Sequence, residues 1–440
     1  MINRKWIKMN PSQLLVLVFS VFILLGTILL KLPIATNNSI TWLDALFTAT
    51  SAMTVTGLVV FDTGTVYTTF GEVVILCLIQ IGGLGIMSFA VLIFMVLGRK
   101  IGMKERILVQ QALNQTSLGG VINLVKYLFI FSFSIELIAM MFLAIRWVPE
   151  YGWGDGLYYS LFHAVSAFNN AGFGLWPDNL ISYVGDPIVN IVISLLFIIG
   201  GIGFTVLLDL KNKNSFKRLS LHTKLMLWGS LLINVFAMMA IFFIEYNNPH
   251  TLGSLSFMEK IWASYFQGVA PRTAGFNTLD LAALKEPTIL LIIILMFIGA
   301  GSGSTGGGIK LTTFILIVFS VISFLKGRED IVVLRRTIKE RLIVKALSIS
   351  VISLLFVMVG IFILSLTENA PLLFIFFEVV SAFGTVGLTL GLTYTLTPIG
   401  KIVIIIVMFF GKLGPLTMVY SLGKPKKEKI KYPSEDVLTG

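Results

Sequence analysis

Long apolar windows that lack charged residues divide the chain at regular intervals. Eight such windows occur, the third with Glu136 as its only charge: 9–30, 73–98, 127–145, 187–208, 225–244, 287–309, 346–367 and 402–411 continuing through 413–423. A membrane-spanning helix needs about 20 apolar residues. The pattern therefore predicts eight transmembrane helices. The sixth extends to about residue 325 and is interrupted at 299–308 by glycine and serine.

Four shorter apolar stretches of about 11 residues lie between these windows. Each is too short to cross a bilayer and fits a re-entrant helix. Each is followed by a turn that contains glycine. The stretches and their turns are 41–52 with TVTGL (54–58), 157–167 with NNAGF (169–173), 257–267 with RTAGF (272–276) and 371–382 with GTVGL (384–388).

The four stretches align with one another. An aromatic residue stands ten positions before each turn glycine, and the glycines are 115, 103 and 112 residues apart. A second glycine follows in the next apolar window after 25, 28, 24 and 24 residues. Reuse of one unit at near-constant spacing is typical of repeat architectures. The aligned positions are Phe47, Phe162, Tyr265 and Phe377 for the aromatics, Gly57, Gly172, Gly275 and Gly387 for the turns, and Gly82, Gly200, Gly299 and Gly411 for the second glycines.

This alignment predicts an all-α membrane protein made of four helix–re-entrant pore helix–helix repeats, with pseudo-fourfold symmetry around a central pore. The repeats are expected at 1–98, 99–210, 211–325 and 326–423, with a cytoplasmic tail at 424–440. The third repeat contains the interrupted window.

Composition and charge support a multi-pass membrane protein. Apolar residues make up 56% of the chain and charged residues 12%, which excludes a large soluble globule and a disordered chain. The single Cys77 excludes a disulfide framework, and three histidines leave little material for a transition-metal site.

Basic residues mark one side of the membrane. Of the 33 lysines and arginines, 24 lie in the N-terminal segment and the connections 99–106, 211–224, 326–345 and 424–431, on alternate sides of successive spans. The positive-inside rule then predicts a plasma-membrane protein with both termini cytoplasmic. Such regular alternation disfavours nucleic-acid binding. Segments 326–345 and 424–431 are expected to contact either anionic lipid or a cytosolic partner.

The glycine turns are candidates for an ion filter. Irregular backbone at membrane depth persists only where it is buried in protein or lines a wet cavity. Four loops that converge on one axis would surround a hole with carbonyl oxygens, which replace the hydration shell of a cation as in potassium channels. For a single glycine, close helix packing is the competing explanation. The backbone groups expected to bind potassium are those of Thr54, Val55, Thr56, Gly57, Asn169, Asn170, Ala171, Gly172, Arg272, Thr273, Ala274, Gly275, Gly384, Thr385, Val386 and Gly387.

The loops are not identical, so one carbonyl ring is expected rather than a stack of four equal rings. Only the first and fourth resemble the TVGYG motif of potassium channels. Selectivity should therefore be looser than in those channels. The only metal expected is a monovalent cation.

Several motifs resemble the Trk/Ktr/HKT superfamily of potassium transporters, and most closely the membrane subunit of bacterial Ktr systems. They are TATSAMTVTGL (48–58), HAVSAFNNAGF (163–173), RTAGFN (272–277), GSGSTGGGIK (301–310), EVVSAFGTVGL (378–388) and GKLGPLTM (411–418). The resemblance implies potassium uptake stimulated by sodium, a homodimer, and a cytosolic ring of regulatory subunits that bind ATP or ADP. It implies no organic cofactor in this chain. In related plant transporters, serine at the first filter glycine accompanies sodium preference, so Gly57 favours potassium.

The glycine-rich interruption is a candidate gate. Glycine costs about 1 kcal/mol in a helix interior, so this segment is expected to form a loop that blocks the pore below the filter. The resemblance also assigns an intramembrane gate here. A phosphate-binding loop is disfavoured because Gly308 is followed by Ile309-Lys310-Leu311 rather than by Lys-Ser/Thr. The expected gate residues are Gly299, Ala300, Gly301, Ser302, Gly303, Ser304, Thr305, Gly306, Gly307, Gly308, Lys310 and Lys412.

Four ionisable residues lie within apolar segments. Lys412 is expected to face the pore, repel cations and bond the gate carbonyls, and the alternative is that it reaches a membrane interface. Arg272 is expected to point behind the filter to a carboxylate, with Glu378 as one candidate. Glu136 is expected to bond inside the bundle rather than to relay protons or bind sodium. His163 is expected to pack rather than to bind a ligand.

Two other functions compete with potassium uptake as interpretations of the sequence. The first is a transporter of the same fold that conducts sodium or couples sodium to potassium. The second is an intramembrane protease or acyltransferase, which would need a Ser/His, paired Asp or HExxH arrangement within the spans. The sequence contains none, so an enzyme is not expected. Gly82-Gly83-Leu84-Gly85 and Gly200-Gly201-Ile202-Gly203 resemble part of a dinucleotide motif but lack its strand context, and helix packing explains them better.

Overall fold

The computed structural model describes residues 11–85, 88, 121–328, 330–422, 433 and 435. Three of the predicted basic segments lie outside these residues: the one before residue 9, the connection 99–106 and the segment 424–431. The end of the second apolar window, beyond residue 88, also lies outside them.

The described chain is almost entirely helical and follows the four-repeat order. The first repeat contains α1 (Pro11–Leu30), α2 (Trp42–Thr54), α3 (Thr63–Val66) and α4 (Thr69–Leu84). The second contains α7 (Val121–Phe168), α8 (Pro187–Ile202) and α9 (Phe204–Asn212). The third contains α10 (Leu221–Glu245), α11 (Phe257–Val269), α12 (Glu286–Phe297) and α13 (Leu311–Leu325). The fourth contains α14 (Glu340–Thr367), α15 (Leu372–Gly384), α16 (Pro398–Leu413) and α17 (Pro415–Leu422).

The strands are confined to one small hairpin in the described residues. Strand β1 (Val332–Val333) pairs antiparallel with β2 (Arg336–Thr337) between α13 and α14. Short 3-10 turns occupy Ile181–Tyr183, Phe216–Arg218, Leu281–Ala283 and Leu392–Thr395. The predicted all-α membrane fold of helix–pore helix–helix repeats is confirmed.

The pore helices α2 and α11 begin where the sequence supplies a capping motif. Thr41 and Asp44 form a capping box before α2, and Ser256 and Glu259 form another before α11, which satisfies backbone N–H groups that the helix leaves unpaired. The second pore helix continues from α7, and the break between them lies at Gly152, whose φ is 85°. Glycine adopts this left-handed conformation without penalty.

In the second and fourth repeats the second long helix is not one straight span, which the apolar pattern did not predict. The pairs α8/α9 and α16/α17 bend by 91° and 100°. By length and composition, four described helices can cross a membrane alone, or six spans exist if each bent pair is counted as one. The bends lie at Gly203 and Gly414, and α4 ends at the equivalent Gly85. All three have φ between 82° and 105°, so a helical conformation ends there.

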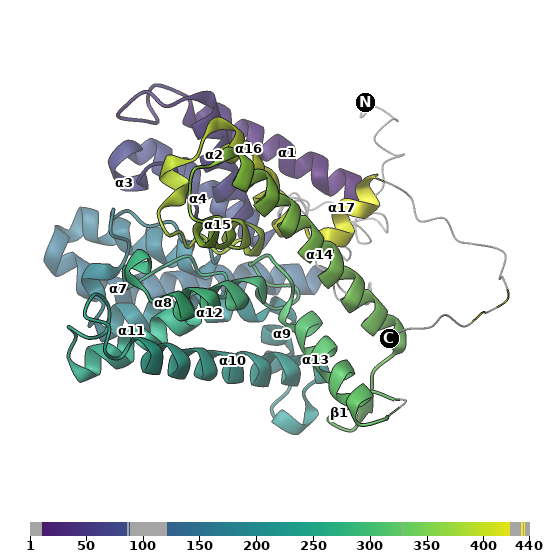
Figure 1. The fold of residues 1–440 in the computed structure, drawn as a ribbon. Helices are drawn as coiled ribbons and strands as arrows, with labels where there is room; N and C mark the ends of the chain where they lie inside the picture. The colour runs from purple at the N-terminus through teal and green to yellow at the C-terminus, as the bar shows by residue number, and fades with distance from the viewer. Residues whose placement is uncertain are drawn as a thin grey trace.

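The repeats surround the pore helices and close on themselves. Figure 1 shows α2 and α15 in the interior of the bundle, with α14 running obliquely across one face. The last element, α17, packs against α1, and the Gln13 side chain donates a hydrogen bond to the Ser421 carbonyl oxygen at 3.1 Å. The fourth repeat therefore meets the first, as a ring of four units requires.

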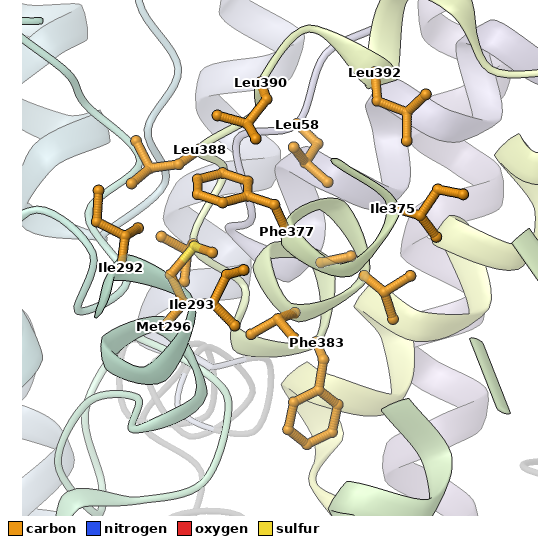
Figure 2. Close-up of a cluster of buried hydrophobic side chains, with 14 of the residues drawn as sticks. Leu58, Ile292, Ile293, Met296, Ile375, Phe377, Phe383, Leu388, Leu390 and Leu392 are labelled. Atoms are coloured by element: carbon orange, nitrogen blue, oxygen red, sulfur yellow. The ribbon is translucent and has the colours of Figure 1, made fainter. Parts of the chain in front are cut away.

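An apolar core fixes the pore helices against the helices that follow them. Figure 2 shows Phe377 and Phe383 of α15 with Met296 of α12, and with Leu58 and Leu388, the residues that follow two of the turn glycines. All five side chains are fully or almost fully buried. Close packing of this kind resists displacement of the loops.

Candidate functional site

The four turn glycines lie against one another in a closed ring. A β-carbon added at Gly172 would lie 2.6 Å from the Cα of Gly275, and one added at Gly275 would lie 2.5 Å from the carbonyl oxygen of Val386. A β-carbon at Gly387 would collide with the carbonyl of Thr56 in the first loop, and one at Gly57 with the second loop. Each loop thus abuts the next, and only glycine fits at the contacts.

The four loops share one unusual backbone conformation. In each, the residue two positions before the glycine has a positive φ: 51° at Val55, 58° at Asn170, 70° at Thr273 and 50° at Thr385. The glycines themselves have φ of 91°, 68°, 75° and 90°. The positive φ thus recurs at every second residue in each loop. A non-glycine residue in this region costs about 1–2 kcal/mol, and such strain concentrates at functional sites.

Hydrogen bonds to the pore helices hold this backbone in place. The N–H groups of Thr56, Ala171 and Val386 donate to carbonyls five residues earlier, at 2.8, 2.8 and 2.9 Å. The N–H of Gly57 also donates to the Ser51 hydroxyl at 3.1 Å. The loops are therefore rigid continuations of the pore helices.

A cavity of about 250 Å³ opens on the side of the ring where the chain leaves the glycines. All four turn glycines line it, as do three aspartates, one from each of the first three loops: Asp62, Asp178 and Asp280. Tyr394 lines it from the fourth loop. Burial raises the pKa of Asp62, and a hydrogen bond from Tyr394 opposes that shift in part. The sequence analysis did not select these carboxylates as site residues.

The glycine-rich segment lies on the opposite side of the ring, against residues that precede the glycines. The Thr305 hydroxyl donates to Asn170 Oδ1 at 2.8 Å, and the Gly307 N–H donates to Thr385 Oγ1 at 2.8 Å. Asn170 in turn donates to the Thr273 hydroxyl at 3.2 Å. One loop therefore contacts three of the four turns. It is also bonded to α8, since the Gly301 N–H donates to the Gly201 carbonyl at 2.8 Å.

Two lysines bond the carbonyls of this segment. Lys412 Nζ donates to the Thr305 carbonyl at 2.5 Å, and Lys310 Nζ donates to that of Gly306 at 2.6 Å. Lys412 follows the second glycine of its repeat, where the first two repeats have Gly83 and Gly201. Its side chain thus points to the glycine-rich loop and not to a membrane interface.

The second glycines pack beneath the turns. A β-carbon at Gly82, Gly200 or Gly411 would collide with the backbone carbonyl of Met53, Phe168 or Phe383, each four residues before a turn glycine. The glycines in 82–85 and 200–203 therefore allow the helix to pack closely against the turn, and the helix then ends at Gly85 or Gly203. Gly299 contacts Gly307 of the glycine-rich segment instead.

The predicted partner of Arg272 is wrong. Arg272 is buried and donates to Asn234 Oδ1 of α10 at 3.1 Å, not to Glu378. Glu378 accepts hydrogen bonds from Thr389 and Thr393 in its own repeat. Each side chain bonds within its own repeat, so the two do not meet.

The other buried ionisable residues behave as predicted. Glu136 bonds inside the bundle, where Gln80 donates to both its oxygens at 3.1 Å and Asn169 donates at 3.4 Å. His163 packs against Trp176 with ring centroids 4.3 Å apart, and its Nδ1 lies 2.8 Å from the Tyr159 carbonyl oxygen.

These features define a class: a multi-pass helical membrane protein whose four re-entrant loops form one central ring. The family model described as "TrkH: Cation transport protein" matches residues 7–428. The chain therefore belongs to the TrkH family of cation transport proteins, as the sequence motifs indicated.

Relatives and a solved structure agree with this assignment. The chain is 61% identical to Ktr system potassium uptake protein B of Bacillus subtilis, over 99% of this chain and 98% of the relative. It is 42% identical to the protein of the same name from Vibrio alginolyticus, over 98% and 96%. It is 38% identical to the potassium/sodium uptake protein NtpJ of Enterococcus hirae, over 98% of each. The crystal structure of the potassium transporter TrkH from Vibrio parahaemolyticus has the same fold, with a TM-score of 0.75 at 21% identity, covering 96% of this chain and 87% of that one.

Proposed function

We propose that the chain is the membrane subunit of a bacterial potassium uptake system and conducts potassium through the ring of turn glycines. The shared backbone conformation of the four loops carries this proposal. Such a ring offers a dehydrated cation inward-facing carbonyl oxygens in place of water. The names of the relatives that align over nearly the whole chain support potassium as the ion.

The ring is selective for potassium over sodium because all four loops keep glycine where neighbouring loops touch. A sodium-conducting or sodium–potassium coupled transporter of the same fold is the second candidate. The name of the Enterococcus hirae relative favours it. In the leading proposal, sodium acts as a stimulating ion.

The glycine-rich loop acts as the gate of this pore. It contacts three of the four filter loops, and Lys310 and Lys412 add positive charge on that side. In this position the loop obstructs cations, and its displacement opens the path. Because glycine adopts a wide range of backbone dihedral angles, the loop can move with little backbone strain.

The subunit works as a homodimer in the plasma membrane, with both termini cytoplasmic, docked on a cytosolic ring that binds ATP or ADP. The word "system" in the names of two relatives supports a separate regulatory component. The basic hairpin between α13 and α14, with Arg335 and Arg336, supports the orientation.

Substitution of the first filter glycine tests the proposal. Gly57→Ser forces a β-carbon into the backbone of the second loop, so potassium flux into liposomes should fall at least tenfold or selectivity over sodium should be lost. Gly327→Ser is the matched control, because Gly327 also has a positive φ of 60° but has nothing within 4 Å of an added β-carbon. Wild-type flux and selectivity in Gly57→Ser would contradict the filter assignment.

A further inference from the structure

One position on the pore helices recurs in contact with the chain that leaves the filter. It lies nine residues before each turn glycine and is occupied by Thr48, His163, Phe266 and Glu378. In three of the four repeats, a side chain at this position accepts a hydrogen bond from the segment that follows the glycine. The sequence alignment of the repeats did not select this position for that role.

These hydrogen bonds, four in three repeats, differ in chemistry but join the same two parts of each hairpin. The Tyr67 hydroxyl donates to Thr48 Oγ1 at 2.9 Å. The Leu175 N–H lies 3.4 Å from His163 Nε2 and donates to it. Thr389 donates to Glu378 Oε2 at 2.7 Å, and Thr393 donates to Oε1.

These bonds are shielded from solvent. Thr48, His163 and Glu378 are at most 1% exposed, so loss of a partner leaves a buried polar atom unpaired, which is more costly than loss of an exposed bond. The segments that they hold also form the outer mouth of the ring. Thr389 lines the 250 Å³ cavity directly, as does Trp176, which stacks on His163.

We propose that Thr48, His163 and Glu378 are positioning residues for the filter, and that they set its selectivity among monovalent cations. This inference rests on the proposed function. Each side chain ties the outgoing segment of its loop to a rigid pore helix and so fixes the distance between opposite carbonyls. A filter whose outgoing segments are loosened adjusts to a smaller ion and discriminates less.

The third hairpin lacks a hydrogen bond at this position. Phe266 has no polar atom and packs against Phe197, with ring centroids 5.7 Å apart. The neighbouring Gln267 does not substitute for it, because neither of its amide atoms has a hydrogen-bond partner among the described residues. The loop of this hairpin carries Thr273, which lies against Gly306 of the glycine-rich segment. The filter loop without this hydrogen bond is thus one that the glycine-rich segment contacts.

Variants at Glu378 and Thr48 test the inference in purified protein reconstituted into liposomes. The readout is the ratio of potassium to sodium uptake, measured beside the total potassium flux. Thr48→Val removes one hydrogen bond and should lower the ratio about fivefold, which corresponds to about 1 kcal/mol. Glu378→Leu removes two hydrogen bonds and should lower the ratio by at least that factor. Glu378→Gln and Thr48→Ser keep an acceptor and should retain most of the wild-type ratio.

Glu368→Leu is the matched control. Glu368 is a buried carboxylate of the same repeat that accepts from the Thr397 hydroxyl at 2.6 Å and the Thr397 N–H at 3.0 Å. It holds the start of α16 and not a filter segment, so its loss should lower thermal stability and leave the ratio unchanged.

The outcomes separate the inference from the function on which it rests. A folded Glu378→Leu variant with the wild-type ratio overturns the inference, as does an equal change in Glu368→Leu. If Glu378→Leu does not fold, Thr389→Val replaces it. That variant removes one of the two bonds to Glu378 and should lower the ratio about fivefold, as Thr48→Val does, and an unchanged ratio overturns the inference. Absence of selective potassium flux in the wild-type protein would instead refute the proposed function.

Discussion

Replacement of Lys412 by glutamine should increase potassium flux in the absence of a regulatory partner. In the structure, the Lys412 ammonium donates to the carbonyl oxygen of Thr305, the gate-loop residue whose hydroxyl reaches Asn170 in the filter. In the proposed gate, this bond belongs to the state in which the loop obstructs the pore. Its removal therefore destabilises that state relative to the open one.

The size of the effect follows from the type of bond. A hydrogen bond to a charged group contributes about 1.5–3 kcal/mol and a neutral bond about 0.5–1.5 kcal/mol. The glutamine amide still donates a neutral bond, so the net loss is about 1–1.5 kcal/mol, or a shift of about tenfold toward the open state. Flux should rise by the same factor while the open state is the minor population. Loss of the positive charge below the filter acts in the same direction.

The assay is potassium-driven flux in liposomes that contain the purified membrane subunit alone. Lys401→Gln is the matched control, since Lys401 lies on the same helix, 11 residues earlier, and its Nζ pairs with Asp44 at 2.7 Å away from the gate. That variant should lose stability without gaining flux. Unchanged or reduced flux from folded Lys412→Gln protein would refute the gate argument.

Three further predictions concern the glycine-rich loop and the mouth of the ring. Deletion of residues 301–308 removes the segment that contacts the filter loops and should raise flux without a regulatory partner, measured in the same liposomes, whereas unchanged flux would contradict the gate assignment. Replacement of the three mouth carboxylates by asparagine should raise the potassium concentration for half-maximal uptake about threefold at low ionic strength, and less at high salt, because the field of the mouth is screened. An equal effect at both salt concentrations would contradict this reasoning. The carboxylates are Asp62, Asp178 and Asp280. Burial raises the pKa of Asp62, so its charge is lost as pH falls through that raised value. Uptake at low potassium should decline over the same range in the wild type and less in Asp62→Asn.

Much of the architecture could be predicted because it depends on local patterns. Span length, the short apolar stretches and the spacing of Gly57, Gly172, Gly275 and Gly387 are properties of the sequence alone. Four equivalent turns imply one axis whatever the side chains around them. The ring contacts between neighbouring glycines follow directly from that symmetry.

Other features required the three-dimensional arrangement. The bends at Gly203 and Gly414 lie within apolar windows, where a single glycine is compatible with a continuous helix. The partner of Arg272 could not be predicted because Asn234 lies 38 residues away on a helix whose rotation the sequence leaves open.

The spacing of two of the mouth carboxylates is visible in the sequence. Asp62 and Asp280 both follow their turn glycine by five residues, so comparison of the outgoing segments would have found them. Asp178 follows its turn glycine by six residues, so the spacing of the carboxylates is not strict. The donors to Thr48 and Glu378 lie in the same outgoing segments, at spacings that differ between the repeats.

The central claim is that four loops of one chain bind a dehydrated potassium ion with their backbone carbonyls. The most direct test is an anomalous difference map from crystals of the protein grown with rubidium, a potassium substitute that scatters strongly. The account predicts a peak on the axis within the ring of Gly57, Gly172, Gly275 and Gly387. A ring without a peak, or rubidium bound only to side chains elsewhere in the bundle, would contradict it.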